Sequence, residues 1–407
     1  MVASDDDKPD CLTYCLQGSK LNLVSWGHEY LRCLSGQIGV QYQNRIEKSE
    51  SVDDILSLVD QIIPEFINHN EEAEAVDLLM EVERLSKLEV FCNKNNFERV
   101  CIYLLSCQAY AADTEEQQQT LHTAFDVYRK FSRFTEALRV AQKMNNMTLI
   151  QQVMTECKDP LVLKQMAFML GRQRNPYTTD DNELTRIISN EKLSEHYKSL
   201  GRELNVLEPK HPDQVFKTHL EDKRFNSGAG IDSAKKNLAL TYVNAFVNAG
   251  FGKDLLITNE NNEDWVFKTK EDGQTAAAAS LGMLLLWDID EGLAQIDKYM
   301  DRKENNIVAG AFMALGLVNS GITNECDPVQ AILIDKLESC RETNLKIGAL
   351  MGLSFTYAGS ARTDLLEAIS PIILDSGNST QLQAVAALAI GLIYVGTCDE
   401  DAAQSIL

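Results

Sequence analysis

Four stretches of small and apolar residues decide the fold of this chain: AAAASLGMLLLWD at 276–288, AGAFMALGLVNSG at 309–321, IGALMGLSFTYAG at 347–359 and AVAALAIGLIYVG at 384–396. Each is long enough for about three and a half turns of α-helix, and alanine and leucine favour that conformation. Glycine inside a helix costs up to about 1 kcal/mol relative to alanine, which is tolerated where another helix must approach closely. We therefore predict four tightly packed inner helices.

The four stretches recur at a nearly constant spacing. Successive small residues at matching places are 34, 38 and 37 residues apart: Gly282, Gly316, Ser354 and Gly391. Each stretch is followed by a more polar segment of helical pattern: 289–300, 327–339, 363–374 and 400–407. A two-helix unit that repeats every 35–38 residues or so is typical of an α-solenoid. Glycine also closes the last three stretches, which predicts a left-handed residue after each inner helix.

The residues before these repeats have a different helical pattern. From about residue 11 to residue 200, apolar side chains recur at helical spacing, as in the set Ile55, Leu58, Val59 and Ile62. Short connections between such segments are typical of antiparallel helical hairpins. The pattern breaks at 207–230, which contains two prolines and the run NSGAG.

We therefore predict an all-α protein in three parts. An N-terminal helical-hairpin array occupies 1–225, a connecting segment occupies 226–273, and an incomplete α-solenoid of helix-pair repeats occupies 274–407. Within the connecting segment we expect one short extended piece, at 265–268.

The composition excludes several classes of partner. The chain has 407 residues and a formal net charge of −22. Because an acidic surface repels phosphate backbones, we expect no binding to nucleic acid. The longest apolar stretch, at 384–396, is shorter than the ~20 residues that span a bilayer, so we expect no membrane segment. The acidic first ten residues lack the apolar run of a signal peptide.

The sequence offers no sign of catalysis. The ten cysteines form no C-x-x-C pair, and no histidine lies at zinc-ligand spacing from them, so we expect free thiols, no metal site and a reducing compartment. Phosphate-binding, H-E-x-x-H and G-x-S-x-G motifs are absent from the sequence. We therefore expect no enzyme activity, no catalytic residue and no cofactor.

Acidic clusters stand in two of the predicted repeat turns. WDIDEGLAQIDKY at 287–299 joins the first inner helix to its outer helix, and TCDED at 397–401 takes the same place in the fourth repeat. Two interpretations stay open. Aspartate at a helix start stabilises the helix dipole in a solvated turn, or these turns form an exposed edge that binds a partner, as solenoids do. The acids concerned are Asp288, Asp290, Glu291 and Asp297 in the first turn, and Asp399, Glu400 and Asp401 in the second.

Longer strings along the chain resemble a known family. They are SWGHEY (25–30), EAVDLLMEVE (74–83), KFSRFTEAL (130–138), KQMAFMLGR (164–172), DSAKKNLALTYVNAFVNAGFGKD (232–254) and AAASLGMLLLWDIDEGLAQIDKY (277–299). These strings are similar to the largest non-ATPase scaffold subunit of the proteasome regulatory particle base. The stretches AGAFMALGLVNSG and GTCDED resemble its proteasome/cyclosome repeats. The likeness is collinear from about residue 11 to the end.

The resemblance implies a fold and a set of partners. It implies an N-terminal helical region followed by a toroid of repeats, with a role in ubiquitin-dependent protein degradation in the cytoplasm and nucleus. The implied partners are the proteasome ATPase subunits, ubiquitin, the ubiquitin-like domains of shuttle receptors and a deubiquitinating enzyme. One implied docking surface matches 287–295, with Ile289 and Asp290 as the best matches and Gln295 at its end. Another begins at the turn matched by Asp401.

The chain departs from that family in length. Members carry further N-terminal sequence, more repeats and a C-terminal domain, so we expect this sequence to be a fragment or an incomplete gene product. The alternative from another class is a free-standing adaptor of HEAT or armadillo type. Such an adaptor would have polar inner helices and ladders of Asn or Arg, whereas the inner stretches here are apolar and rich in Gly and Ala.

Overall fold

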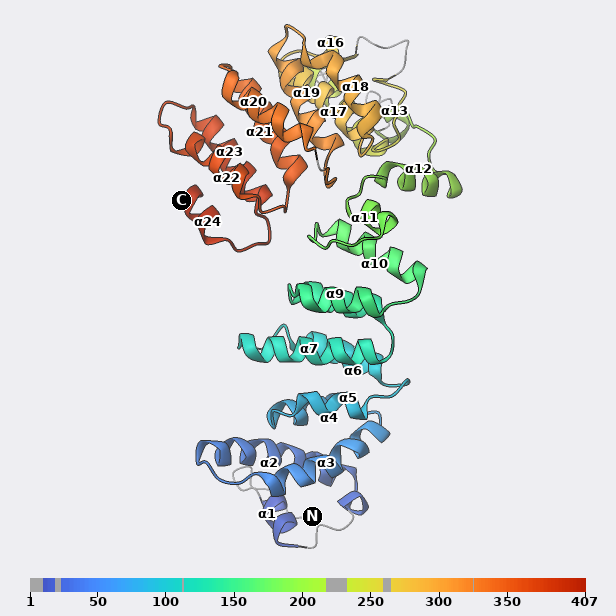
Figure 1. Cartoon of the computed structure of the whole chain (residues 1–407), viewed down its shortest axis with the longest axis vertical. Coiled ribbons are helices and arrows are strands. Elements are labelled where there is room, and N and C mark those ends of the chain that lie inside the picture. The colour runs from blue at the N-terminus through green and yellow to red at the C-terminus, as the bar shows by residue number, and fades with distance from the viewer. Residues whose placement is uncertain (1–9, 19–22, 112, 217–232, 259–264, 325) are drawn as a thin grey trace, which may run out of the picture. The chain divides into compact units, whose positions relative to one another are not determined.

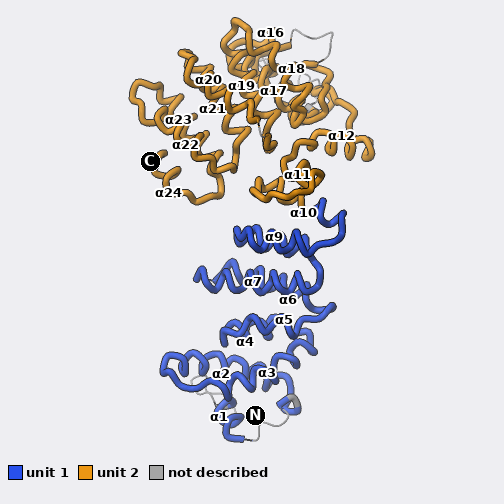
Figure 2. The backbone as a smooth tube through the Cα atoms, viewed as in Figure 1, with its two compact units in different colours: residues 1–166 blue, residues 167–407 orange. Residues whose placement is uncertain are grey.

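The computed structural model describes residues 10–18, 23–111, 113–216, 233–258, 265–324 and 326–407. In these residues every regular element is a helix, so the predicted all-α class is confirmed (Figure 1). The contacts divide the chain into two compact units, Met1–Met166 and Ala167–Leu407 (Figure 2).

Unit 1 is a row of short antiparallel helices. Its elements are α1 (Asp10–Gln17), η1 (Leu23–Trp26), α2 (His28–Glu47), α3 (Asp53–Asn68), α4 (Glu72–Glu81), η2 (Leu85–Lys87), α5 (Leu88–Phe91), α6 (Phe97–Cys107), α7 (Thr114–Lys130), α8 (Phe134–Lys143) and α9 (Met147–Glu156). The helix α10 (Pro160–Arg172) contains the division between the units. The predicted stripe on α3 is confirmed, because Ile55, Leu58, Val59 and Ile62 are all buried.

Unit 2 begins with α11 (Asn182–Ile188), α12 (Leu193–Glu203) and α13 (Pro212–Phe216). The helix-pair repeats follow as alternating inner and outer helices: α17 (Asp272–Leu284), α18 (Ile289–Met300), α19 (Asn305–Val318), α20 (Pro328–Ser339), α21 (Thr343–Tyr357), α22 (Thr363–Leu374), α23 (Thr380–Ile393) and α24 (Glu400–Ile406). The inner helices α17, α19, α21 and α23 stack on one another in chain order. The predicted solenoid of helix pairs is therefore confirmed, and closure into a toroid stays a prediction.

The inner helices approach one another backbone to backbone. A Cβ atom added to Gly282 would lie 2.6 Å from the Cα of Ala314, and one added to Gly316 would overlap the backbone of Gly352. Real side chains cannot occupy such positions without moving the neighbouring helix. The small residues that the sequence repeats are therefore required by the packing of α17 on α19 and of α19 on α21.

Gly391 does not follow this pattern. It takes the matching place on α23, but a Cβ atom added there would meet nothing within 4 Å. The expectation of close approach at all four small positions is therefore wrong for Gly391, because no described helix lies against that side of α23. The three closing glycines agree with prediction: Gly321, Gly359 and Gly396 have φ of 77°, 73° and 79°.

The extended piece expected at 265–268 is wrong. These residues form the single-turn helix α16 (Trp265–Lys268), which buries Val266 against Ala277 and Ala278 of α17. The Trp265 indole N–H donates to the Thr241 hydroxyl at 3.0 Å. An extended segment without a partner strand would leave its backbone groups unpaired, whereas a helical turn satisfies them internally.

The connecting segment also contains a further inner helix. The helix α15 (Ser233–Val247) packs on α17 as α17 packs on α19. The backbone N–H groups of Gly250 and Gly252, just after α15, donate to the carbonyls of Met283 and Leu284 at the end of α17. The predicted boundary at 225 lies among residues 217–232, outside the described residues, and the division of 226–273 from the repeats stays a prediction.

The glycine packing gives a matched pair of substitutions. Gly316→Ala should lower the free energy of unfolding by about 1–3 kcal/mol, because the new methyl group overlaps the Gly352 backbone. Gly391→Ala should raise it by up to about 1 kcal/mol, because the methyl group finds open space and alanine favours the helix. Urea denaturation followed by circular dichroism measures both. Equal effects of the two substitutions would contradict the assignment of inner-helix contacts.

Candidate partner-binding surfaces

The first acidic turn is held by its backbone. Trp287 adopts a left-handed conformation, with φ of 66°. Its N–H donates to the Val318 carbonyl at the end of α19, at 3.0 Å. The Trp287 ring packs edge-on against the Tyr197 ring of α12, with centroids 5.5 Å apart. The turn between α17 and α18 is therefore fixed to two neighbouring elements before any partner arrives.

Both carboxylate oxygens of Asp288 already have partners within the fold. It is the N-cap of α18, where its carboxylate accepts from the Glu291 N–H. Its other oxygen pairs with the Lys198 ammonium of α12 at 2.5 Å, and only 15% of its side chain is exposed. The interpretation of Asp288 as a helix-stabilising acid therefore fits the geometry. It does not present a free carboxylate at the surface.

The remaining predicted residues of this turn differ in exposure. Asp290 and Asp297 are exposed and lie seven residues apart on α18, which places them on one face of the helix. Ile289 and Gln295 are half-buried beside them. The structure therefore leaves an acidic face carried by Asp290 and Asp297, which we call the α18 acidic face.

The second acidic turn repeats the arrangement. Asp399 is the N-cap of α24 and accepts from the Ala402 N–H at 2.8 Å. Asp401, in the first turn of α24, is exposed. Burial raises the pKa of the Tyr394 hydroxyl, and the nearby Asp399, Asp364 and Asp401 raise it further. These three carboxylates therefore lie near the Tyr394 hydroxyl at this turn.

The two acidic turns lie at corresponding ends of the first and fourth inner helices, so the structure does not bring them into one cluster. In the turns between them, Asp327 is paired with the Arg362 guanidinium and accepts from the Tyr357 hydroxyl. Arg362 pairs with Asp364 as well, and its guanidinium lies 4.9 Å from the centroid of the Tyr357 ring. Asp327 and Asp364 therefore share the one guanidinium of Arg362 within the fold.

Sequence reasoning missed the segment that holds these turns. Within unit 2, residues 174–198 run along the ends of the inner helices, and we call them the bridging segment. The Arg174 guanidinium donates to the Thr356 carbonyl of α21 at 2.5 Å, and the Asn190 amide donates to the Gly321 carbonyl at 2.8 Å. At its end, Lys198 pairs with Asp288 as described. Burial lowers the pKa of Arg174.

The bridging segment gave no signal in the sequence, because its contacts join residues 90 to 182 positions apart in the chain. Arg174 and Asn190 of this segment donate to backbone carbonyl groups, which every residue possesses. No residue type at the receiving end marks such a contact. Periodicity detects apolar faces, and these contacts are polar and lie at helix ends.

An apolar groove crosses the inner helices of unit 2. Its volume is about 580 Å³, and its lining includes exposed aromatic residues of α15, with Phe246 70% exposed. Other apolar side chains of the lining come from α17, α19 and α21: Met283, Met313, Leu317, Ile347 and Phe355. The groove can accept an apolar surface, and it carries no titratable group besides Asp272 and Tyr242.

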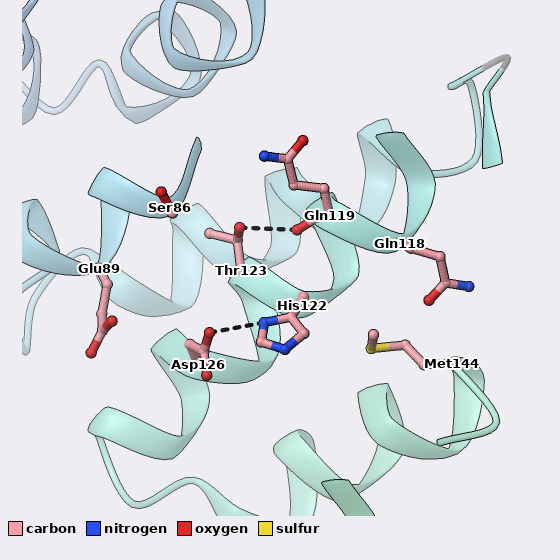
Figure 3. A pocket seen from close by; sticks show the side chains of 8 residues that line it. All are labelled: Ser86, Glu89, Gln118, Gln119, His122, Thr123, Asp126 and Met144. Atoms are coloured by element: carbon pink, nitrogen blue, oxygen red, sulfur yellow. Dashed lines mark hydrogen bonds and ion pairs between the residues drawn. The ribbon is translucent and has the colours of Figure 1, made fainter. Parts of the chain in front are cut away.

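A smaller polar pocket of about 340 Å³ lies in unit 1 (Figure 3). His122 lies near its centre and pairs through Nδ1 with Asp126 at 3.0 Å. The neighbouring Thr123 hydroxyl donates to the Gln119 carbonyl of its own helix at 3.0 Å, so it is not activated by the imidazole. The pocket therefore lacks the nucleophile–base contact that acyl transfer requires.

No described helix is long and apolar enough to cross a membrane. Among the same residues, no group of three or more His, Cys, Asp or Glu side chains could hold a metal ion.

Comparisons with known proteins all point to one protein family. Residues 1–221 match the family described as RPN1 N-terminal domain. The chain is 42% identical over 409 residues to the 26S proteasome regulatory subunit rpn1 of Schizosaccharomyces pombe, across 100% of this chain and 46% of that protein. It is 40% identical over 402 residues to the 26S proteasome non-ATPase regulatory subunit 2 of Dictyostelium discoideum, across 98% of this chain and 44% of that protein. The chain thus spans a little less than half the length of these relatives.

The division of the acids into caps and exposed residues can be measured. Asp288→Ala should lower the free energy of unfolding by about 1–2 kcal/mol, because α18 loses its N-cap and Lys198 loses its partner. Asp288→Asn keeps a capping oxygen and should cost less. Asp290→Ala should change the free energy by less than about 0.5 kcal/mol, since its side chain is exposed. Chemical denaturation ranks the three variants, and an Asp290→Ala loss as large as that of Asp288→Ala would contradict this division.

Proposed function

Because this chain belongs to the RPN1 N-terminal domain family, we propose that it is part of a non-catalytic scaffold subunit of the proteasome regulatory particle base. In this role it holds the proteasome ATPase subunits and serves ubiquitin-dependent protein degradation. The observation that carries the proposal is the alignment of nearly the whole chain with proteins named as 26S proteasome regulatory subunits. The helical repeats suit a scaffold, since solenoids present long surfaces to partners.

The α18 acidic face supplies the docking chemistry in this proposal. Ubiquitin and ubiquitin-like domains present an apolar patch with a basic rim. Asp290 and Asp297 offer two exposed carboxylates for the rim, and Ile289 offers a half-buried apolar contact beside them. Gln295 adds an amide. Shuttle receptors and a deubiquitinating enzyme carry such domains, so they share this surface.

The α23–α24 turn is the second docking surface of the proposal. Asp401 is exposed there, and Asp399 fixes the start of α24. The proposal places the protein in the cytoplasm and nucleus. The state of the cysteines supports that placement, since none of the ten cysteines, which all lie among the described residues, is in a disulfide bond.

A free-standing adaptor of HEAT or armadillo type predicts different inner helices. Its binding groove would be lined by polar ladders, whereas the groove across α15, α17, α19 and α21 is lined mainly by apolar side chains. Isolation of the tagged gene product from cells, followed by identification of bound proteins, separates the two functions. We expect proteasome ATPase subunits in stoichiometric amount, and transport factors without proteasome subunits would overturn the proposal.

The docking surface can be tested by charge reversal. Asp290→Lys with Asp297→Lys should lower the association rate with a ubiquitin-like domain about tenfold or more, because like charges then face its basic rim. The effect should shrink as salt shortens the Debye length from roughly 10 Å at 0.1 M to 3 Å at 1 M. Stopped-flow fluorescence with a labelled ubiquitin-like domain measures the rate.

The matched control is Asp335→Lys with Glu338→Lys. Both side chains are exposed on α20, and the change in net charge is the same. If the control slows association as much as the α18 pair, steering by the total charge explains the effect and the α18 acidic face is not the docking site. Circular dichroism of each protein confirms that the helices are intact.

A further inference from the structure

Three cysteines of unit 1 lie together where α1 packs on α2. The Sγ atoms of Cys11 on α1 and Cys33 on α2 are 3.6 Å apart, although 22 residues separate them in the chain. Cys15 follows Cys11 by one helical turn and is buried at the same contact. Both Cys11 and Cys33 are half-buried, so a small solute can reach them.

The position of the pair is set by contacts on both helices. Leu12, next to Cys11, is only 2% exposed and anchors α1 on α2. The Gln37 side chain accepts from the Leu12 N–H at 2.9 Å through Oε1, and its Nε2 donates to the Cys33 Sγ at 3.9 Å. The same amide therefore holds the start of α1 and one of the two sulfur atoms. The close approach of the thiols is built into the fold.

Other cysteines of the chain lack one of these properties. Cys92 and Cys101 are buried in the core, and burial raises the pKa of each thiol to about 12. Such thiols are poor nucleophiles at neutral pH. Cys326 and Cys398 are exposed, but they lie in separate turns of unit 2.

We propose that Cys11 and Cys33 form a reversible, peroxide-driven disulfide that fastens α1 to α2. One thiolate attacks hydrogen peroxide, the O–O bond breaks, and a sulfenic acid and hydroxide result. The second thiolate attacks the sulfenic sulfur, the S–S bond forms and hydroxide leaves. The two thiol protons convert both hydroxides into water, so two thiols and one peroxide yield one disulfide and two waters. A dithiol reductant reverses the step by exchange.

The geometry favours this outcome over further oxidation. The sulfur atoms need to close by only about 1.5 Å to reach the disulfide length of about 2.05 Å. A sulfenic acid at either position therefore meets its partner before a second peroxide arrives. The bond closes a loop of α1, η1 and the start of α2, which restricts the detachment of α1. This inference is independent of the proposed docking function.

The test oxidises the full chain with hydrogen peroxide under native conditions and alkylates the remaining thiols. Non-reducing digestion and mass spectrometry should find a peptide that links Cys11 to Cys33 as the main disulfide. Titration of the unfolded protein should show a fall from ten free thiols to eight, and dithiothreitol should restore ten. Hydrogen exchange of the α1 amides should slow about tenfold in the oxidised protein, because opening of α1 is restricted.

Three variants make the result specific. Cys33→Ser should abolish the cross-link and leave Cys11 as a sulfenic acid that dimedone traps. Cys15→Ser and Cys326→Ser should leave the cross-link unchanged. A main disulfide between Cys11 and Cys15, or full alkylation of Cys11 and Cys33 after oxidation of the exposed cysteines, would overturn the proposal. The wild-type comparison of peroxide with dithiothreitol needs no substitution, so the test stands even if a variant fails to fold.

Discussion

The repeats of this protein depend on direct contact between the backbones of neighbouring inner helices. At Gly282 and Gly316 an added methyl group would overlap the next helix, so the spacing of the stack is set by the absence of side chains. Two of the turns also tie neighbouring helix ends together by backbone hydrogen bonds, as the Trp287 N–H does by donating to the Val318 carbonyl and the Gly359 N–H by donating to the Leu392 carbonyl. The edge that carries the acidic turns is therefore a product of the small residues, which lie on a different part of each helix.

Within each acidic turn, the aspartates differ in whether they cap the outer helix. An aspartate directly before an outer helix, such as Asp288 or Asp399, satisfies backbone N–H groups and stabilises the helix start. The aspartate two positions later, Asp290 or Asp401, is exposed to solvent. The capping aspartate and the second aspartate of each turn are therefore only two residues apart in the sequence, but the carboxylate of the capping one already accepts a hydrogen bond from the helix. The helix-stabilising interpretation therefore fits Asp288 and Asp399, and partner binding by the exposed acids of the same turns stays a prediction.

The sequence allowed the helices and repeats to be predicted because apolar periodicity is a local property. The outer helices 289–300 and 363–374 were predicted to the residue. Trp265 was misread because a short apolar run with flanking polar residues fits a strand or a single helical turn, and its Thr241 partner lies 24 residues away. Gly391 was misread because a pattern of small residues does not show which neighbour is present. The pairing of Asp288 depends on Lys198, whose approach no local pattern indicates.

The bridging segment makes the charge of the proposed docking edge a property of the whole unit. Lys198 neutralises Asp288, and Arg174 and Asn190 occupy the carbonyls at the ends of α21 and α19. A basic partner that approaches this edge therefore meets the acids that the bridging segment leaves uncompensated, Asp290 and Asp297 among them. Charges that remain exposed act mainly on the rate and selectivity of encounter, since water screens them. The charge that this edge presents to solvent thus follows from which carboxylates already pair or cap within the fold.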